Sequence, residues 1–282
     1  MNPIYATWCI SNNIGDALTP WLIKKITGRL PLYVEPGESF PKYMVTGSIL
    51  NHSTDYTTVW GAGFAQFDDC VQGKPVAYAV RGHISQGRLA FQNGIHAPVV
   101  GDPALLLPRF YNPKPEKKCR VGFIPHYVHQ KETILWLRGR DDIKLINVFD
   151  SVEDFVQDLL ECEVVYSSSL HGLIIADAYG IPRHWYNGTN RLGGDGAKFA
   201  DYYSLVKCEN FSRPHIYELP ADIEELYKRA ARNEPPNVKE ICDNLWSCCP
   251  FKPVENQNGT NTAVNSGTDN PGESKEAATP DG

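Results

Sequence analysis

The sequence lacks any long apolar segment. No window of its 282 residues approaches the roughly 20 consecutive apolar residues that a membrane-spanning helix requires. Its first ten residues also lack the cationic start and apolar run of a secretory signal. We therefore expect a cytoplasmic protein that makes at most peripheral contact with the inner face of a membrane.

The sequence also lacks an excess of positive charge and any paired cysteine motif. The net charge is −6, so a nucleic-acid backbone would be repelled on average, and we expect no nucleic-acid partner. The 8 cysteines include no C-x-x-C pair, which argues against a zinc site and, in a cytoplasmic protein, for reduced thiols. We expect no metal.

The end of the chain has too few large apolar residues to fold. From Lys252 to Gly282 there is no Leu, Ile or aromatic residue. Such a segment cannot bury enough apolar surface to offset the entropy lost on ordering. We expect a disordered tail over residues 251–282.

Before the tail, short apolar runs alternate with amphipathic segments, which is typical of βαβ units around a mostly parallel sheet. A Pro- and Lys-rich stretch from Pro108 to Lys118 interrupts this rhythm and looks like a link between lobes. The sequence thus predicts an α/β protein with two Rossmann-like lobes, residues 1–112 and 113–250. The predicted strands are Lys42 to Val45, Thr58 to Trp60, Val76 to Val80, Val99 to Val100, Cys119 to Ile124, Ile143 to Val148, Glu163 to Tyr166 and Arg183 to Tyr186, and the predicted helices are Asp16 to Thr27, Val152 to Glu161, Leu173 to Tyr179, Ile223 to Asn233 and Val238 to Trp246.

Ligands of open α/β sheets bind beyond the carboxyl ends of the strands, so the residues that follow each strand are informative. The strand ending at Tyr166 leads into Ser167, Ser168, Ser169, Leu170, His171 and Gly172. His171 should therefore stand at a helix N-terminus, where free N–H groups and the helix dipole favour an anion. A helix cap with an incidental histidine is the alternative.

Other strand ends carry weaker signals. Arg81 follows the strand ending at Val80 and offers a planar fork for phosphate or carboxylate. The alternative is that Arg81 is an ordinary surface arginine exposed to solvent. Asn12, Asn13 and Asp16 surround the start of the first helix, where they can bind a sugar hydroxyl or a phosphate, or cap the helix.

Glycines and histidines extend the candidate set. Gly61 and Gly63 allow a close backbone approach, but they lack the third glycine of a dinucleotide fingerprint. The loop from Gly188 to Lys198 has four glycines and presents Arg191 and Lys198, which suggests closure over an anionic substrate, with an ordinary exposed loop as the alternative. His126 follows another strand and is expected to contact substrate or pack rather than bind a metal.

These pieces, in this order, resemble the polysaccharide pyruvyl transferase family, most closely its exopolysaccharide branch. The resemblance covers about Asn12 to Leu205, and the segments that carry it are Asn13-Ile14-Gly15-Asp16, Trp60-Gly61-Ala62-Gly63-Phe64, Arg81 with Ser85, Gly101-Asp102-Pro103-Ala104-Leu105-Leu106, Leu170-His171-Gly172 and Lys198-Phe199.

The resemblance implies a two-domain fold like that of GT-B glycosyltransferases. It also implies phosphoenolpyruvate as donor substrate, a pyruvate ketal on a sugar of a bacterial glycan or its lipid- or nucleotide-linked precursor, and no cofactor. The family's catalytic histidine corresponds to His171, its strand-end arginine to Arg81 and its late lysine to Lys198. We expect His171, Arg81 and Asp16 to be catalytic, and the other residues named above to contact substrate, among them Gly15, Ser85, Leu170 and Gly172.

One departure from the family concerns charge. Ser169 stands where family members often have an arginine, so one cation of the donor site is missing, and Arg191 is the candidate to replace it. Two alternatives remain at this point: a nucleotide-sugar glycosyltransferase of the same architecture, and a non-catalytic carbohydrate-binding protein.

Overall fold

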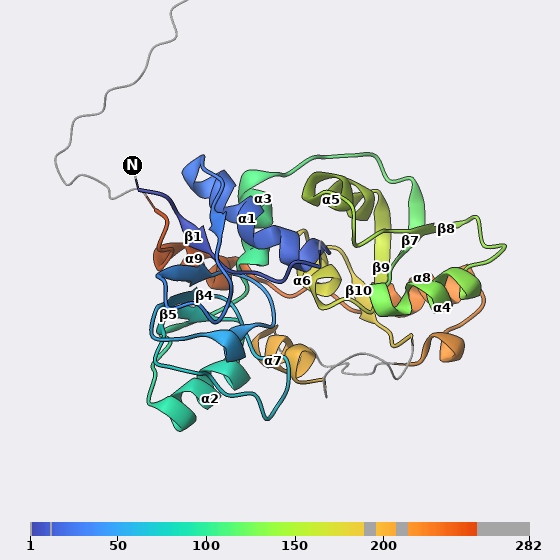
Figure 1. The fold of residues 1–282 in the computed structure, drawn as a ribbon. Coiled ribbons are helices and arrows are strands. Elements are labelled where there is room, and N and C mark those ends of the chain that lie inside the picture. Colours follow the sequence, from blue (N-terminus) through green and yellow to red (C-terminus); the bar gives the residue numbers. More distant parts are fainter. Residues whose placement is uncertain (1, 12, 189–195, 207–213, 253–282) are drawn as a thin grey trace, which may run out of the picture. The chain divides into compact units, whose positions relative to one another are not determined.

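The computed structural model describes residues 2–11, 13–188, 196–206 and 214–252, which lie in one compact unit. The first sheet of this unit has six strands in the order β2-β1-β3-β4-β5-β6, and all its pairings are parallel (Figure 1). Its strands are β1 Tyr5–Ala6, β2 Leu32–Tyr33, β3 Lys42–Met44, β4 Thr57–Trp60, β5 Val76–Val80 and β6 Val99–Val100.

The second sheet has four strands in the order β10-β9-β7-β8, again with parallel pairings. Its strands are β7 Cys119–Ile124, β8 Ile143–Leu145, β9 Cys162–Ser167 and β10 Arg183–Trp185. Parallel strands need crossover connections, and helices supply them here. The helices are α1 Ile14–Thr27, α2 His83–Asn93, α3 Leu107–Phe110, α4 Gln130–Trp136, α5 Val152–Leu160, α6 Leu170–Ala178, α7 Ala197–Val206, α8 Ile223–Ala231 and α9 Lys239–Ser247.

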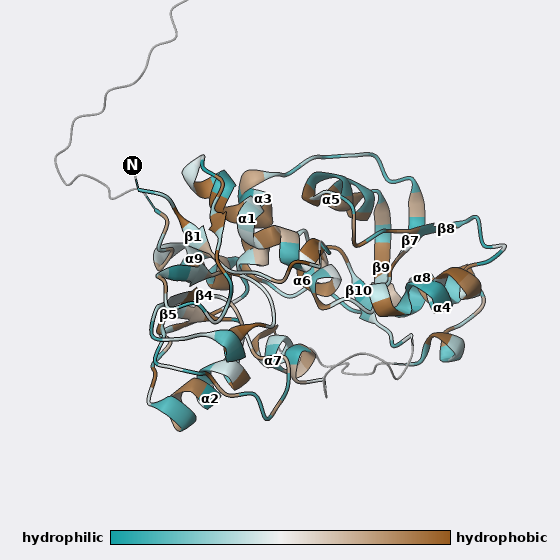
Figure 2. Ribbon diagram, in the orientation of Figure 1, coloured by the Kyte–Doolittle hydropathy of each residue, from teal (hydrophilic) through white to brown (hydrophobic). Residues whose placement is uncertain are grey.

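The helices differ in how far they are buried. In α5 the residues Val152, Phe155, Val156 and Leu159 are buried on one side, and hydrophobic and hydrophilic colours both appear on this helix in Figure 2. By contrast, α6 is buried along nearly its whole length, so its start lies inside the protein rather than on its surface. A buried helix start must direct its unbonded N–H groups at something polar.

Two late helices return to the first sheet. The α7 residue Asp201 accepts hydrogen bonds from Ser85 at the start of α2, and Figure 1 shows the two helices side by side. At α9, the Leu245 carbonyl oxygen accepts a hydrogen bond from the indole N–H of Trp60 at the end of β4. The strands of the first sheet end at residue 100, and those of the second sheet begin at residue 119. The helices α7 and α9 follow the second sheet in the sequence but contact the first.

The α/β class with parallel sheets is confirmed, and the two-lobe boundaries stay a prediction. The predicted start of the helix after the serines is wrong: α6 begins at Leu170, not Leu173, so His171 lies within its first turn. Lys198 likewise belongs to a helix, α7, rather than to the glycine-rich loop. The predicted disordered tail starts too early, because Phe251 is buried and packs against Tyr43 and Trp60. The rest of the predicted tail, from residue 253 on, lies outside the described residues. None of the helices in the described ranges has the length and apolar character that a bilayer crossing requires.

Candidate active site

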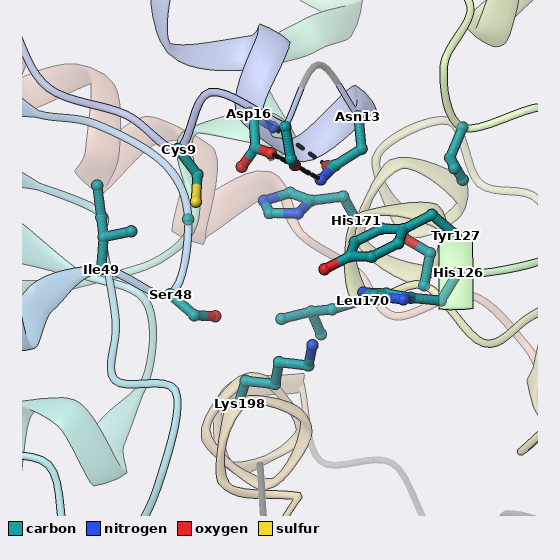
Figure 3. Close-up of a pocket in the computed structure, with 14 residues that line it drawn as sticks. Cys9, Asn13, Asp16, Ser48, Ile49, His126, Tyr127, Leu170, His171 and Lys198 are labelled. Atoms are coloured by element: carbon teal, nitrogen blue, oxygen red, sulfur yellow. Dashed lines mark hydrogen bonds between the residues drawn. The ribbon is translucent and has the colours of Figure 1, made fainter. Parts of the chain in front are cut away.

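A pocket of about 270 Å³ lies where the carboxyl ends of the two sheets meet. Figure 3 shows His171 beneath Asp16 and Asn13, with Lys198 pointing into the pocket from α7. Its described lining residues come from segments far apart in the sequence: Cys9, Ser11, Asn13, Asp16, Gly47, Ser48, Ile49, His126, Tyr127, Val148, Ser169, Leu170, His171 and Lys198.

The start of α1 forms one wall. Asn13 caps this helix, because its Oδ1 accepts hydrogen bonds from the backbone N–H groups of Gly15 and Asp16 at 3.0 and 3.4 Å. The Nδ2 of Asn13 donates to the carboxylate of Asp16 at 2.6 Å, and the Ser11 hydroxyl donates to the same oxygen. Burial raises the pKa of Asp16, and the Ser11 hydrogen bond and the charges of His171 and Lys198 oppose this rise. Hydrogen bonds thus fix the position of the Asp16 carboxyl group, and its raised pKa suits it to proton exchange.

The start of α6 forms the opposite wall. Ser169 is the N-cap residue, but its side chain makes no capping hydrogen bond, and the first-turn N–H groups of an α-helix have no partners within the helix. His171 is in this first turn, and its side chain is 12% exposed. An anion in the pocket would therefore meet N–H groups, a serine hydroxyl and an imidazole together.

Lys198 brings a cation to the pocket from the first turn of α7. Burial and, to a lesser degree, the charge of Arg81 lower the pKa of Lys198 to about 8, although the charge of Asp16 partly offsets both. A lysine in this state gains a full charge when an anion binds beside it. Of the described residues that line the pocket, it is the one that carries an ammonium or guanidinium group.

His126 and Tyr127 lie on the side of β7. Burial lowers the pKa of His126 to about 3, and the neighbouring Lys198, His129 and His171 contribute to this shift. Its Nδ1 accepts a hydrogen bond from the Val128 N–H at 3.4 Å. His126 is therefore neutral at physiological pH, where it can contact a substrate without adding charge.

Arg81 lies elsewhere than the sequence suggested. Its guanidinium group is fully buried behind the pocket wall, where Nε and Nη2 contact the Asp201 carboxylate at 3.0 and 2.9 Å. The same group donates to Ser48 Oγ at 2.7 Å and to the Phe64 carbonyl oxygen at 2.6 Å. Arg81 therefore does not line the pocket as the expected fork for a ligand, but it contacts the lining residue Ser48, and its charge affects Lys198.

Several other predicted contacts support the site from behind. A side chain at Gly63 would collide with the Arg81 guanidinium, and Ser85 binds Asp201 instead of a ligand. Ser167 donates to the Ser169 carbonyl oxygen at 2.8 Å, and Ser168 accepts from the His126 N–H at 2.9 Å. Gly172 leaves room for the Ser167 hydroxyl, Gly15 for the His171 ring and Gly61 for Pro103. These residues shape the pocket without lining it.

Two predicted residues, Asn12 and Arg191, lie outside the described residues. Sequence reasoning missed Cys9, Ser11, Gly47, Ser48, Ile49 and Val148 as lining residues. The strand-end rule identifies Gly47 and Ser48, because they follow β3 as closely as His171 follows β9. The same rule marks Val148, which follows β8 by three positions as Gly47 follows β3. Its carbonyl oxygen accepts a hydrogen bond from the Ile14 N–H at 2.6 Å.

No cluster of three or more His, Cys, Asp or Glu side chains suited to a metal is found in the described part of the chain. The chemistry available is that of an imidazole, a carboxyl group and an ammonium group around an anion-binding helix start. Whether a cofactor takes part stays a prediction from the sequence.

Comparison with known proteins gives two matches. A family model described as polysaccharide pyruvyl transferase matches residues 59–190, which contain Arg81, His126 and His171. A relative named Uncharacterized protein L143, from Acanthamoeba polyphaga mimivirus, is 30% identical over 207 residues. The aligned region is 70% of this chain and 72% of that relative, so it extends well beyond the pocket residues.

Proposed function

We propose a specific reaction for this chain, which belongs to the polysaccharide pyruvyl transferase family. The chain takes the enolpyruvyl unit of phosphoenolpyruvate and transfers it to two hydroxyls of one sugar, which yields a pyruvate ketal and inorganic phosphate. The acceptor is a polysaccharide or its lipid- or nucleotide-linked precursor. The observation that supports this most is one pocket in which Asp16, His171 and Lys198 converge.

The donor is an anion with a phosphate and a carboxylate, and it needs cations and N–H groups more than an apolar cavity. Lys198 and the first turn of α6 supply these groups, and the Ser169 hydroxyl adds one more donor. A bound anion offsets the burial and the Arg81 charge that keep the pKa of Lys198 near 8. Donor binding thereby stabilises the protonated lysine.

The reaction begins with protonation of the donor's methylene carbon by His171 as general acid. The neighbouring carbon then becomes electrophilic, and a sugar hydroxyl attacks it while Asp16 accepts the hydroxyl proton. Phosphate leaves, and a second hydroxyl of the same sugar attacks the same carbon to close the ring. One hydroxyl proton replaces the proton that His171 gave to the new methyl group, and the other leaves with phosphate, so the protons balance.

Arg81 acts in this scheme as a positioning residue. It holds Ser48 at the pocket wall and Asp201 within α7, three residues after Lys198. Its charge also lowers the pKa of Lys198. Replacing it would therefore alter the donor site without removing a ligand contact.

The test is to incubate the full-length protein with phosphoenolpyruvate and a panel of glycan precursors. Mass spectrometry should find an acceptor that gains one pyruvate less one water, with release of an equal amount of phosphate. His171→Ala should abolish both signals while its circular dichroism and phosphoenolpyruvate binding match the wild type. Consumption of a nucleotide sugar instead, or glycan binding with no donor-dependent product, would reject the proposal.

A further inference from the structure

Asp102 is a buried carboxylate next to His171. It follows β6 and is 0% exposed, and its Oδ1 accepts a hydrogen bond from the Ala104 N–H at 3.0 Å, which caps the short helix Pro103–Leu106. Its Oδ2 lies 3.6 Å from Nε2 of His171. Both atoms are buried, and neither has a hydrogen-bond partner among the described residues. Two buried groups of matching chemistry thus face one another slightly beyond hydrogen-bond distance.

We propose that Asp102 is a positioning residue for His171 and selects the ring nitrogen that exchanges the proton. The Asp102 carboxylate accepts a hydrogen bond from the Nε2–H of His171, which holds the ring in this tautomer and leaves Nδ1 for the ligand. A shift of a few tenths of an ångström closes the 3.6 Å gap. This inference rests on the proposed function, in which His171 is the general acid.

The packing of the ring supports this choice of nitrogen. A side chain at Gly15 would collide first with Nδ1 and Cε1 of His171, so this edge of the ring lies against the start of α1. That helix start carries Asn13 and Asp16, which line the pocket above the ring (Figure 3). Because Nε2 is sealed from solvent, Nδ1 is the ring nitrogen that can meet a ligand.

The surroundings of Asp102 hold its carboxylate in place. The Gly101 N–H donates to the Val80 carbonyl oxygen at 2.8 Å, and Gly61, with a φ of 107°, lets its backbone lie directly against Pro103. The residues of the following short helix are buried, too. The carboxylate therefore comes from a fixed segment that follows the first sheet, whereas His171 comes from a helix that follows the second sheet. Contact between Asp102 and His171 thus depends on how the two sheets pack against each other.

The proposal predicts a specific change in the state of the imidazole. Nitrogen-15 NMR of the full-length protein with labelled histidine, with His171 assigned by comparison with His171→Gln, should show neutral His171 protonated on Nε2. In Asp102→Asn the amide oxygen can still cap Ala104, but the negative charge is gone. The Nδ1–H tautomer should then rise several-fold, and kcat should fall by about 10² to 10⁴-fold with less than about threefold change in the KM for donor.

A second variant separates capping from positioning. Asp102→Ser also keeps a capping oxygen but cannot reach His171, so it should show the same loss of kcat as Asp102→Asn, with a smaller rise of the Nδ1–H tautomer because no amide N–H faces Nε2. Wild-type His171 protonated on Nδ1, or either variant with wild-type tautomer and kcat, would overturn the proposal. The NMR result does not depend on turnover, so it separates two ways of failing. If the proposed reaction is wrong but Asp102 does position His171, the tautomer still shifts in the variants. If Asp102 does not position His171, the tautomer does not shift.

Discussion

Arg81 and Lys198 are two cations close to one pocket, yet their surroundings differ. The guanidinium of Arg81 contacts the Asp201 carboxylate, a hydroxyl and a carbonyl oxygen. The ammonium of Lys198 has no hydrogen bond or ion pair within the described part of the chain, and it lies 5.5 Å from the centroid of the Phe199 ring. A buried charge is tolerated when paired and costly when alone. Arg81 therefore stabilises the fold, whereas Lys198 is available to pair with an anionic ligand.

The electrostatics of the two residues agree with this division. The carboxylate of Asp201 compensates the charge of Arg81 at 2.9 Å, whereas burial and the nearby Arg81 act together against the charge of Lys198. An anion in the pocket changes the balance for Lys198 alone. Both residues were expected to bind the donor, and only their partners in the fold tell them apart.

The largest expected effect is the loss of stability in Arg81→Met. This change leaves the buried Asp201 carboxylate without its partner, and breaking a buried pair in this way costs about 3–5 kcal/mol in the free energy of unfolding. Lys198→Met removes an unpaired charge and should cost less than about 1 kcal/mol. Urea denaturation of both variants measures the difference.

A double variant checks the cause. In Arg81→Met with Asp201→Leu both charges are absent, and replacing a buried pair by apolar groups is often close to neutral. It should recover more than half of the stability lost in Arg81→Met alone. Equal losses in Arg81→Met and Lys198→Met, or no recovery in the double variant, would contradict the division between the two cations.

The next effect concerns donor binding in Lys198→Met. Loss of a charge-assisted contact with phosphate should raise the KM for phosphoenolpyruvate by about 10- to 100-fold, with the KM for acceptor changed less than about threefold. Lys198→Arg should recover part of the loss because it keeps the charge with a different shape. Steady-state kinetics over both substrates distinguishes this result from a general loss of activity, and an unaltered donor KM would show that Lys198 does not bind the donor.

Much of the fold followed from local patterns, because apolar runs and capping residues act within a few positions of the chain. The first helix ends at Gly28 with a φ of 72°, as its sequence predicts, and β9 leads into the serines and His171. The site at the strand ends followed from the same rule. The two-residue strands β1 and β2 were missed, whereas the equally short β6 was found because both of its residues are β-branched valines.

The partners of Arg81 and His171 could not be predicted in the same way. Asp201 lies 120 positions after Arg81, and Asp102 belongs to a motif recognised in the sequence without a role. Which carboxylate meets which cation depends on how α7 and β6 pack, and no spacing along the chain encodes that. A buried arginine and a ligand-binding arginine at a strand end therefore look alike until the fold is known.

The smallest expected effect is the pH dependence of donor use, and it follows from the same contrast. In the free protein the pKa of Lys198 is lowered to about 8, so above pH 8 a growing fraction of the lysine is neutral and no longer attracts the donor. The affinity for phosphoenolpyruvate, measured by calorimetry, should therefore fall as the pH rises above 8, up to the loss expected for Lys198→Met. Binding separates this effect from turnover, which also requires the proton of His171. In Lys198→Arg the charge persists, so the affinity should stay level to about pH 10. A wild-type profile that stays level over the same range would mean that Lys198 keeps its charge without a ligand, which would remove the distinction drawn between the two cations.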